Sequence, residues 1–299
     1  MSYYLAHFVS WLCCHLPGSF CDWLGRCLGQ MTWPLVPAKR RRMARENIQR
    51  CLATDEQETG RIARASWVRF GPMIFEVLRF PVIKRQIDRY VEIEGAENLR
   101  QGLALGRGAV IASAHSGNWE LMGGALAARG FPIVGVAMRQ KEAGMDRFIN
   151  DYRRLVGMHI TYKDDVREMF SMLKKGWAIG LLMDQDSSVR DGIVLDWFGQ
   201  PTNFVQGPAT LARFKNAPLI PGFITRKADG RHKIILFPPL FVPHTSNKRE
   251  DIRQAMEQLS IILEQYIRQH PEEWFWLHDR WKSMRNRVEP HRPRYKQAD

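Results

Sequence analysis

The stretch of sequence that decides the fold reads Ala109-Val-Ile-Ala-Ser-Ala-His115-Ser-Gly-Asn-Trp-Glu120, and an apolar run follows it directly over 121–128. A short run of β-branched and small apolar residues, then Ser and Gly, then a Leu/Ala-rich segment, predicts a buried strand, a tight turn and a helix. Open α/β sheets place ligands beyond the carboxyl ends of their strands. The turn that carries His115 is therefore the first candidate for a functional site.

The residue types in this turn suggest acid–base chemistry. His115 and Glu120 are five positions apart, so the imidazole can face the crevice while the carboxylate holds one ring nitrogen, as in a general base with an orienting partner. Gly117 permits a tight backbone and Asn118 is a candidate helix N-cap. The alternative is a structural role. In that case the ring nitrogens of His115 are hydrogen-bonded within the protein at a strand end, and Glu120 complements the helix dipole.

The rest of the chain alternates between strand and helix patterns. We predict strands at 90–94, 109–113, 131–137, 159–162, 177–183, 219–225 and 233–237, and helices at 55–80, 96–105, 144–156, 166–175, 207–215 and 251–269. This alternation predicts an α/β fold with a mixed, largely parallel central sheet and helices on both faces, in which the late strands can pair antiparallel.

Polar residues near the predicted strand ends and helix ends are candidates for substrate binding. Arg139 and Asp184 each follow a predicted strand directly, which puts them at the same edge of the sheet as His115. The complete set of substrate-binding candidates is Asn118, Arg139, Arg154, Asp184, Arg213 and Arg226. Each arginine has the alternative of a solvated surface residue. Asp184 and Asp186 could bind a metal, although holding arginines or sugar hydroxyls suits them better.

Charge and tryptophan content narrow the partners. The 299 residues carry 44 Lys and Arg against 31 Asp and Glu, a formal charge of +13, which predicts attraction to nucleic acid, an anionic membrane face, a phosphorylated substrate or an acidic protein. No nucleic-acid-binding module is recognisable, and the cations cluster near apolar, Trp-rich segments. Ten Trp suit a surface where apolar and aqueous phases meet. We therefore expect an anionic membrane leaflet as a partner and no nucleic acid.

The five cysteines all lie within the first 51 residues, and their odd number and irregular spacing argue against a disulfide framework. Cys13, Cys14, His15 and Cys21 lack the paired spacing of a metal site, so small buried hydrophobic residues are the better interpretation. We predict no metal and no cofactor.

The N-terminal segment, 1–52, has the pattern of a membrane-associating region. Two apolar stretches, 3–16 and 20–36, are separated by Pro17-Gly18, and the basic cluster Lys39-Arg-Arg-Arg42 follows them. Neither stretch has the ~20 uninterrupted apolar residues of a spanning helix. Apolar helices followed by cations predict an in-plane anchor on an anionic leaflet. A single span with its basic cluster on the cytoplasmic side, and a hairpin packed on the rest of the protein, are the alternatives.

The segment from His115 to Glu120 also resembles the His-x4-Asp/Glu motif of glycerolipid-type acyltransferases. In this form it is similar to that of the bacterial lipid A biosynthesis, or lauroyl/myristoyl, acyltransferases. Other blocks follow in that family's order and extend the resemblance over most of the chain: 40–48, Asp184-Gln-Asp186, Trp197 to Thr202, Gly207 to Arg213, Asn216 to Pro221 and Pro271 to Lys282.

The resemblance implies a glycerolipid-acyltransferase-like α/β domain over 53–290, with a basic tail over 291–299. It implies transfer of a fatty acyl chain from acyl–acyl carrier protein, an acidic partner, to a hydroxyl of a phosphorylated lipid A-type glycolipid precursor at the cytoplasmic face of the inner membrane. Other acceptors are another glycolipid or a glycerophospholipid, with acyl-CoA as donor. A basic membrane- or nucleic-acid-binding protein without catalysis is the alternative of another class.

Catalysis by direct attack of the acceptor hydroxyl is favoured because the sequence has no Gly-x-Ser-x-Gly nucleophile elbow. Ser116 is the competing nucleophile, but it is too close in sequence to His115 for the usual triad geometry. Amides at the start of the helix after Asn118, or an arginine, could stabilise the oxyanion. Trp197, Phe198 and the tryptophans after 270 line an acyl slot in one interpretation and belong to the core in the other.

Overall fold

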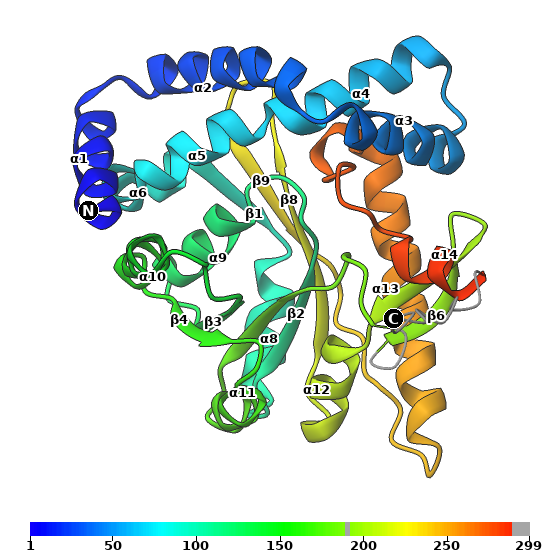
Figure 1. Ribbon diagram of the computed structural model, residues 1–299. Coiled ribbons are helices and arrows are strands. Elements are labelled where there is room, and N and C mark those ends of the chain that lie inside the picture. The colour runs from blue at the N-terminus through cyan, green and yellow to red at the C-terminus, as the bar shows by residue number, and fades with distance from the viewer. Residues whose placement is uncertain (189–191, 289–299) are drawn as a thin grey trace, which may run out of the picture.

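The computed structural model describes residues 1–188 and 192–288, and within them a seven-stranded sheet has the order β1-β9-β8-β2-β5-β3-β4 (Figure 1). The strands are β1 (Val91–Glu94), β2 (Ala109–Ser113), β3 (Ile133–Ala137), β4 (His159–Tyr162), β5 (Ala178–Leu182), β8 (Leu219–Arg226) and β9 (His232–Leu236). All pairings are parallel except that of β8 with β9. The predicted mixed, largely parallel sheet is confirmed, and the basic tail predicted for 291–299 lies outside the described residues.

Strand β2 lies at the centre of the sheet, between β8 and β5. Every residue of β2 is buried. Ala109 and Ile111 belong to the hydrophobic cluster on one face of the sheet, whereas Val110 and Ala112 belong to the cluster on the other face. This two-sided burial explains why the strand is apolar throughout rather than alternating.

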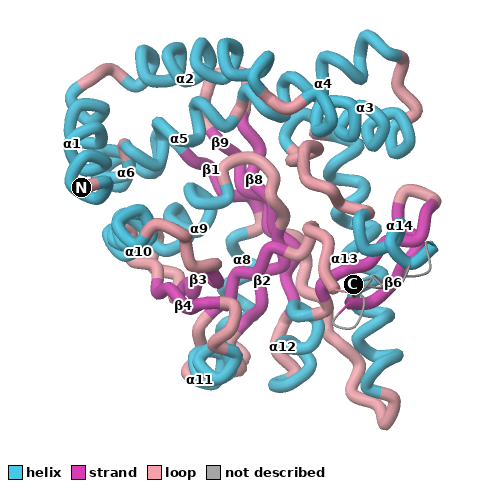
Figure 2. Tube along the Cα trace, in the orientation of Figure 1, coloured by secondary structure: helices cyan, strands magenta, loops and turns pink. Residues whose placement is uncertain are grey.

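Helices cover both faces of the sheet, as predicted (Figure 2). The helices α8 (Ala96–Ala104), α9 (Trp119–Ala128) and α10 (Ala143–Leu155) pack in one hydrophobic cluster, and α11 (Val166–Lys174), α12 (Gly207–Lys215) and α13 (Lys248–Gln269) pack in the other. Because each crossover helix returns the chain to the start of the next strand, the strand–helix turns gather at one edge of the sheet.

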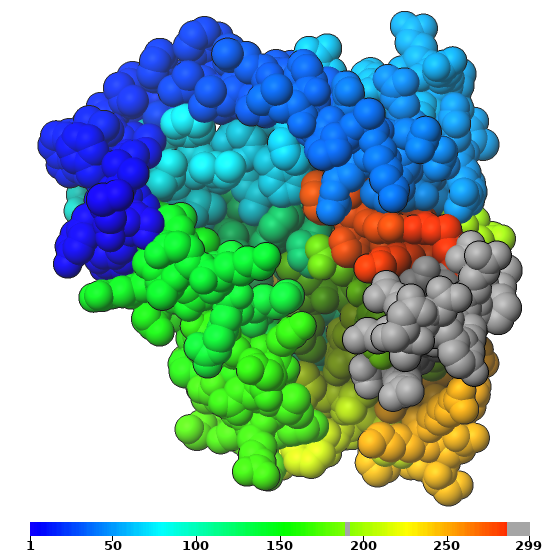
Figure 3. Space-filling view, viewed as in Figure 1, coloured from blue at the N-terminus to red at the C-terminus, as the bar shows by residue number. Residues whose placement is uncertain are grey.

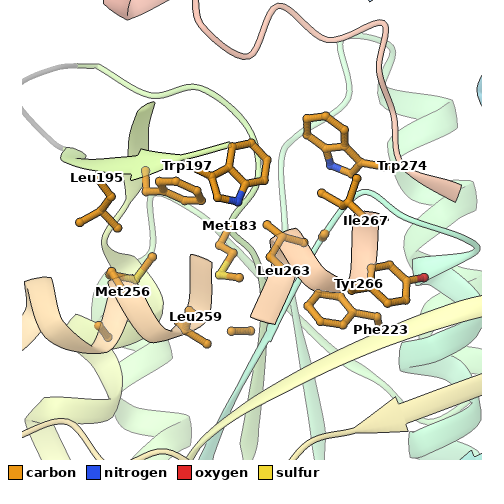
Figure 4. Close-up of a cluster of buried hydrophobic side chains, with 14 of the residues drawn as sticks. Met183, Leu195, Trp197, Phe223, Met256, Leu259, Leu263, Tyr266, Ile267 and Trp274 are labelled. Atoms are coloured by element: carbon orange, nitrogen blue, oxygen red, sulfur yellow. The ribbon is translucent and has the colours of Figure 1, made fainter. Parts of the chain in front are cut away.

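A hairpin of β6 (Gly192–Trp197) and β7 (Gln200–Val205) packs outside the main sheet, against α13. The sequence reading did not identify it as strands. Trp197 is buried and its ring meets Trp274, Trp281 and Phe204 edge-on or stacked. Figure 4 shows Trp197 and Trp274 beside aliphatic side chains of α13 such as Leu263 and Ile267. These tryptophans belong to the core, which is one of the two interpretations that the sequence leaves open.

The first part of the chain is helical: α1 (Ser2–His15), α2 (Gly18–Thr32), α3 (Ala38–Leu52), α4 (Glu56–Val68) and α5 (Phe70–Leu78). The single helix predicted over 55–80 is wrong, because α4 and α5 are separated at Arg69. Pro72 has no N–H to donate to the carbonyl of Val68, which ends the regular hydrogen-bond pattern there. Short helices follow at α6 (Phe80–Ile83) and α7 (Ile87–Tyr90), and α14 (Lys282–Val288) ends the described chain.

Helix α2 is seated on α4 and α5 by glycines. A Cβ on Gly71 would lie 1.9 Å from the carbonyl oxygen of Gly25, and a Cβ on Gly29 would lie 2.6 Å from the carbonyl oxygen of Val68. The backbones therefore approach as closely as only glycine allows. One face of α2 is fixed to the rest of the protein, as in the alternative of a packed hairpin.

The opposite faces of α1 and α2 are apolar and exposed at the periphery of the molecule (Figure 3). We call this surface the N-terminal apolar face; its members are Tyr4, Leu5, Phe8, Val9, Trp11, Leu12, Phe20, Trp23, Leu28 and Met31. Among the described helices, none combines the length and the apolar character needed to span a membrane.

Candidate active site

The turn after β2 is shaped by a glycine and a helix cap. Gly117 has a φ of +58°, and a Cβ there would lie 2.0 Å from the carbonyl oxygen of Ile224. The side chain of Asn118 accepts a hydrogen bond from the amide of Leu121, which confirms the predicted N-cap of α9. The Nδ2 of Asn118 also donates to Glu76 at 2.7 Å. The turn is thus held from both sides, with His115 between the strand and the helix.

His115 is paired with Asp184, at the carboxyl end of the neighbouring strand. Nδ1 of His115 lies 2.8 Å from Oδ1 of Asp184, and the backbone amide of His115 donates to the same oxygen at 3.0 Å. The indole Nε1 of Trp274 donates to Oδ2 at 2.8 Å. The Asp184 side chain is 2% exposed and that of His115 is 21% exposed. A buried carboxylate therefore fixes a ring that remains accessible.

Burial opposes ionisation of Asp184, but the charge of His115 and the hydrogen bonds from His115 and Trp274 outweigh it, and they lower the pKa of the carboxyl to about 2. An ionised carboxylate can only accept a hydrogen bond, so Nδ1 of the imidazole carries the proton. In the neutral ring Nε2 then carries the lone pair, and no hydrogen bond to Nε2 is recorded among the described residues. This is the arrangement of an imidazole poised to accept a proton.

The predicted pairing of Glu120 with His115 is wrong. The carboxylate of Glu120 accepts two hydrogen bonds from Arg153 of α10, at 2.6 and 2.8 Å, and both side chains are 15% exposed. The physical reason lies in the sheet: β5 is the neighbour of β2, so Asp184 reaches Nδ1, whereas Glu120 faces α10 from the first turn of α9. Asp184 is therefore the partner of the imidazole, and Glu120 is one half of an ion pair.

The ring of Trp119 forms a wall beside the imidazole, with ring centroids 5.1 Å apart. Ser116, the alternative nucleophile, is buried and donates its hydroxyl to Tyr266 at 3.1 Å. Within the described chain no contact joins the hydroxyl of Ser116 to the imidazole. The geometry therefore favours direct attack by an acceptor hydroxyl over a covalent acyl-enzyme on Ser116.

The predicted substrate-binding arginines differ in their position relative to His115. Arg139 follows β3 at the same edge as His115, and its guanidinium lies 3.7 Å from the centroid of the Tyr162 ring. Arg154 is an exposed helix residue paired with Asp151, as in the alternative of a solvated arginine.

Arg213 and Arg226 lie at opposite edges of the sheet. Arg213 is paired with Asp251 at 2.8 Å near the end of α12, which precedes β8 and so delivers it to the edge remote from His115. The structure therefore does not bring Arg213 together with His115. Arg226 ends β8 at the His115 edge and pairs with Glu76 and Asp22.

Two residues of this site escaped the sequence reading. The sequence offers Trp274 only as a slot or core residue, yet its indole donates a hydrogen bond to the carboxylate of Asp184. Arg69, in the break between α4 and α5, donates to the backbone carbonyls of Gly117 at 2.7 Å and His115 at 3.1 Å. No local pattern predicts either contact, because each joins segments that are more than 40 positions apart in the sequence.

The site and fold define a class: an α/β protein with a histidine base, oriented by a buried carboxylate, at the carboxyl edge of a parallel sheet. The model of the bacterial lipid A biosynthesis acyltransferase family matches residues 1–283. The chain belongs to this family, and the predicted resemblance is confirmed. As a member, the protein is an O-acyltransferase.

Curated relatives agree with this assignment. A phosphatidylinositol mannoside acyltransferase of Mycobacterium tuberculosis (strain ATCC 25618 / H37Rv) is 34% identical over 73% of this chain and 69% of its own length. The lipid A biosynthesis lauroyltransferase of Escherichia coli (strain K12) is 26% identical over 92% of this chain and 89% of its own length.

Among solved structures, the 1-acyl-sn-glycerophosphate acyltransferase of Thermotoga maritima aligns with a TM-score of 0.38 at 16% identity, covering 81% of this chain and 97% of that chain. The fold assignment rests on the strands and helices described above.

Proposed function

We propose that the protein transfers a fatty acyl chain from acyl–acyl carrier protein to a hydroxyl of a lipid A-type glycolipid precursor at the cytoplasmic face of the inner membrane. His115 is the general base and Asp184 is the residue that orients it. The observation that carries the proposal is the 2.8 Å contact between Nδ1 of His115 and the buried carboxylate of Asp184, at the edge of the sheet where such folds bind ligands.

In the proposed reaction Nε2 of His115 takes the proton of the acceptor hydroxyl while its oxygen attacks the thioester carbonyl. Asp184 stabilises the imidazolium that forms. Amides in the first turn of α9, after Asn118, are the proposed donors to the oxyanion. Collapse of the tetrahedral intermediate forms the ester and breaks the C–S bond, and the imidazolium returns its proton to the thiolate. Acid and base are thus one side chain, and no cofactor is needed.

The partners follow from charge. The formal charge of +13 favours an acidic carrier protein and a phosphorylated lipid, because both carry negative charge. Helices α1 and α2 expose the N-terminal apolar face, and Lys39 to Arg42 follow at the start of α3. An apolar face followed along the chain by cations suits in-plane binding to an anionic leaflet, where each cation adds ~1 kcal/mol. The proposed anchor lies on the membrane rather than across it.

The test is transfer by the purified protein from radiolabelled acyl–acyl carrier protein to a detergent-dispersed lipid A precursor, with the product identified by mass spectrometry. His115→Gln should abolish transfer. His159→Gln is the matched control, because His159 also lies 2.8 Å from a carboxylate, that of Glu168, at the far edge of the sheet. Equal activity in wild type and His115→Gln, or binding of the donor without any acylated product, contradicts the proposal.

A second acceptor class is favoured by one observation: the mycobacterial relative, at 34% identity, is named for phosphatidylinositol mannoside. Parallel assays with a mannosylated phosphatidylinositol and with the lipid A precursor separate the two acceptors. Product only on the mannosylated lipid replaces the proposed acceptor and leaves the roles of His115 and Asp184 intact. Replacing the carrier protein with acyl-CoA in the same assay tests the donor.

A further inference from the structure

A cavity of about 830 Å³ lies between α2, α3, α4 and the end of β8, and it shares Arg69 with the turn that carries His115. Seven of the described side chains that line it are cationic and two are acidic. The cationic ones from the helices are Arg26, Arg45, Arg61, Arg64 and Arg69, and those after β8 are Arg226 and Lys227. The acidic ones are Glu272 and Glu273. The cavity therefore has an excess of positive charge.

Part of this charge is already neutralised. Arg26 and Arg226 pair with Asp22, and Arg61 pairs with Glu58 and Glu272. By contrast, neither an ion pair nor a hydrogen bond is recorded for Arg45 or Arg64 within the described part of the chain. Two exposed guanidinium groups, one from α3 and one from α4, thus line one cavity without a recorded ion pair in the described chain.

Arg69 joins the cavity to the catalytic turn. Its two Nη atoms hold the carbonyls of His115 and Gly117, while its buried Nε has no recorded partner in the described chain. Burial lowers the pKa of Arg69 to about 10, so the group is still charged near neutral pH. The charges of Glu273 and Asp184 only partly offset the burial of Arg69, and an anion in the cavity would stabilise its charge further.

The other lining side chains suit a sugar. Gln30 and Gln57 offer amide donors and acceptors for hydroxyl groups, and Trp33 offers an aromatic wall. The volume is within the range of small-molecule sites, ~300–1,000 Å³. Helix α2 contributes Arg26 and Gln30 to the cavity and Trp23 to the N-terminal apolar face, so the cavity is beside the surface proposed to meet lipid.

We propose that this cavity binds a phosphate monoester, and that its source is the phosphorylated sugar headgroup of the acceptor glycolipid. The second clause rests on the proposed function; the first does not. Arg45 and Arg64 bind the phosphate oxygens, since guanidinium groups match the geometry of phosphate. Arg69 forms the wall shared with the catalytic turn. Of the arginines that the sequence suggested, Arg226 lines this cavity, whereas Arg139, Arg154 and Arg213 lie outside it.

Binding is measured by isothermal titration calorimetry of the full-length protein in detergent, so that the readout is independent of catalysis. The probes are inorganic phosphate, a glucosamine-disaccharide glycolipid bearing a phosphate, and the same glycolipid after phosphatase treatment. The test variant is Arg45→Gln/Arg64→Gln. The matched control is Arg85→Gln/Arg249→Gln, which removes two exposed arginines for which no ion pair is recorded and which do not line the cavity.

The wild type and the control should bind the phosphorylated glycolipid at least about tenfold more tightly than the dephosphorylated one. The test variant should lose this difference, because it lacks the charge-assisted hydrogen bonds to the phosphate. The KM for the phosphorylated acceptor should rise by a similar factor in the test variant only. Equal affinity in the test variant and the control overturns the site. Inorganic phosphate binding as tightly as the glycolipid overturns the headgroup as the source. Phosphate-dependent binding without acyl transfer in the wild type supports the cavity and refutes the proposed function instead.

Discussion

Nδ1 of His115 lies 2.8 Å from Oδ1 of Asp184, although the two residues are 69 positions apart in the sequence. They meet because β2 and β5 are neighbouring parallel strands and each residue follows the carboxyl end of its strand. The indole of Trp274 donates a hydrogen bond to the second carboxylate oxygen, so the position of the Asp184 side chain does not depend on His115 alone. The chemistry proposed here depends on this pair rather than on the local motif alone.

The pair should contribute to stability in a pH-dependent way. The pKa of Asp184 is about 2 in the folded protein against an ordinary value of 3.8, so the ionised carboxylate stabilises the fold by ~2 kcal/mol at neutral pH. Because the folded pKa is the lower one, this contribution is complete above about pH 5 and is lost as the pH falls through about 2. In urea unfolding, the stability gap between wild type and Asp184→Asn should shrink by about half between about pH 6 and about pH 3. A gap of constant size would contradict the pKa.

Glu120 and Arg153 should behave as one structural unit. Both side chains are 15% exposed and joined by two hydrogen bonds, so removing either leaves the other as a largely buried charge without its ion-pair partner. Glu120→Ala and Arg153→Ala should each cost ~3 kcal/mol, and a double-mutant cycle should show a coupling free energy of ~1–3 kcal/mol. The measurement is chemical denaturation of the four proteins. Additive effects would show that the ion pair contributes nothing as a pair.

Gly71→Ala should destabilise the protein through steric overlap. A Cβ at this position would lie 1.9 Å from the carbonyl oxygen of Gly25, so α2 and α5 must move apart, at a cost of ~1–3 kcal/mol. Gly60→Ala, in α4, is the control, because its Cβ would meet only the end of Arg45 at 3.5 Å. Gly60→Ala should leave the free energy of unfolding unchanged or raise it, because alanine has a higher helix propensity than glycine. Equal melting temperatures of the two variants would contradict the close packing.

The N-terminal apolar face should determine membrane binding. Trp11 and Trp23 are 56% and 58% exposed. The double variant Trp11→Ser/Trp23→Ser should therefore reduce cosedimentation with anionic vesicles at least about tenfold. The control Phe241→Ser/Ile261→Ser removes two apolar residues of similar exposure, 50% and 54%, elsewhere on the protein. Unchanged binding in the tryptophan variant, or an equal loss in the control, would rule out this face as the anchor.

Much of the fold could be predicted because its signals are local. The seven strands of the main sheet were expected within about two residues of their observed bounds, since buried β-branched runs and turn residues mark them directly. The hairpin of β6 and β7 escaped prediction because Trp197 and Phe198 suggested a ligand slot. The helix break at Arg69 was not predicted, because apolar residues continue at helical spacing on both sides of Pro72.

The site was predictable only in part, for a topological reason. His115 and Asn118 belong to one turn, and the sequence placed both correctly. The partner of the imidazole depends on which strand lies beside β2, and strand order is not encoded in any window of sequence. Glu120 was the nearest acid along the chain, whereas Asp184 is the nearest acid in space.

The most direct test of the His115–Asp184 assignment is the single-turnover rate of acyl transfer in His115→Gln, Asp184→Asn and the double variant. If the two residues act as one unit, Asp184→Asn should lower the rate by about 10²–10⁴, and the double variant should be no slower than His115→Gln. A near-normal rate in Asp184→Asn, or losses that multiply in the double variant, would contradict the assignment.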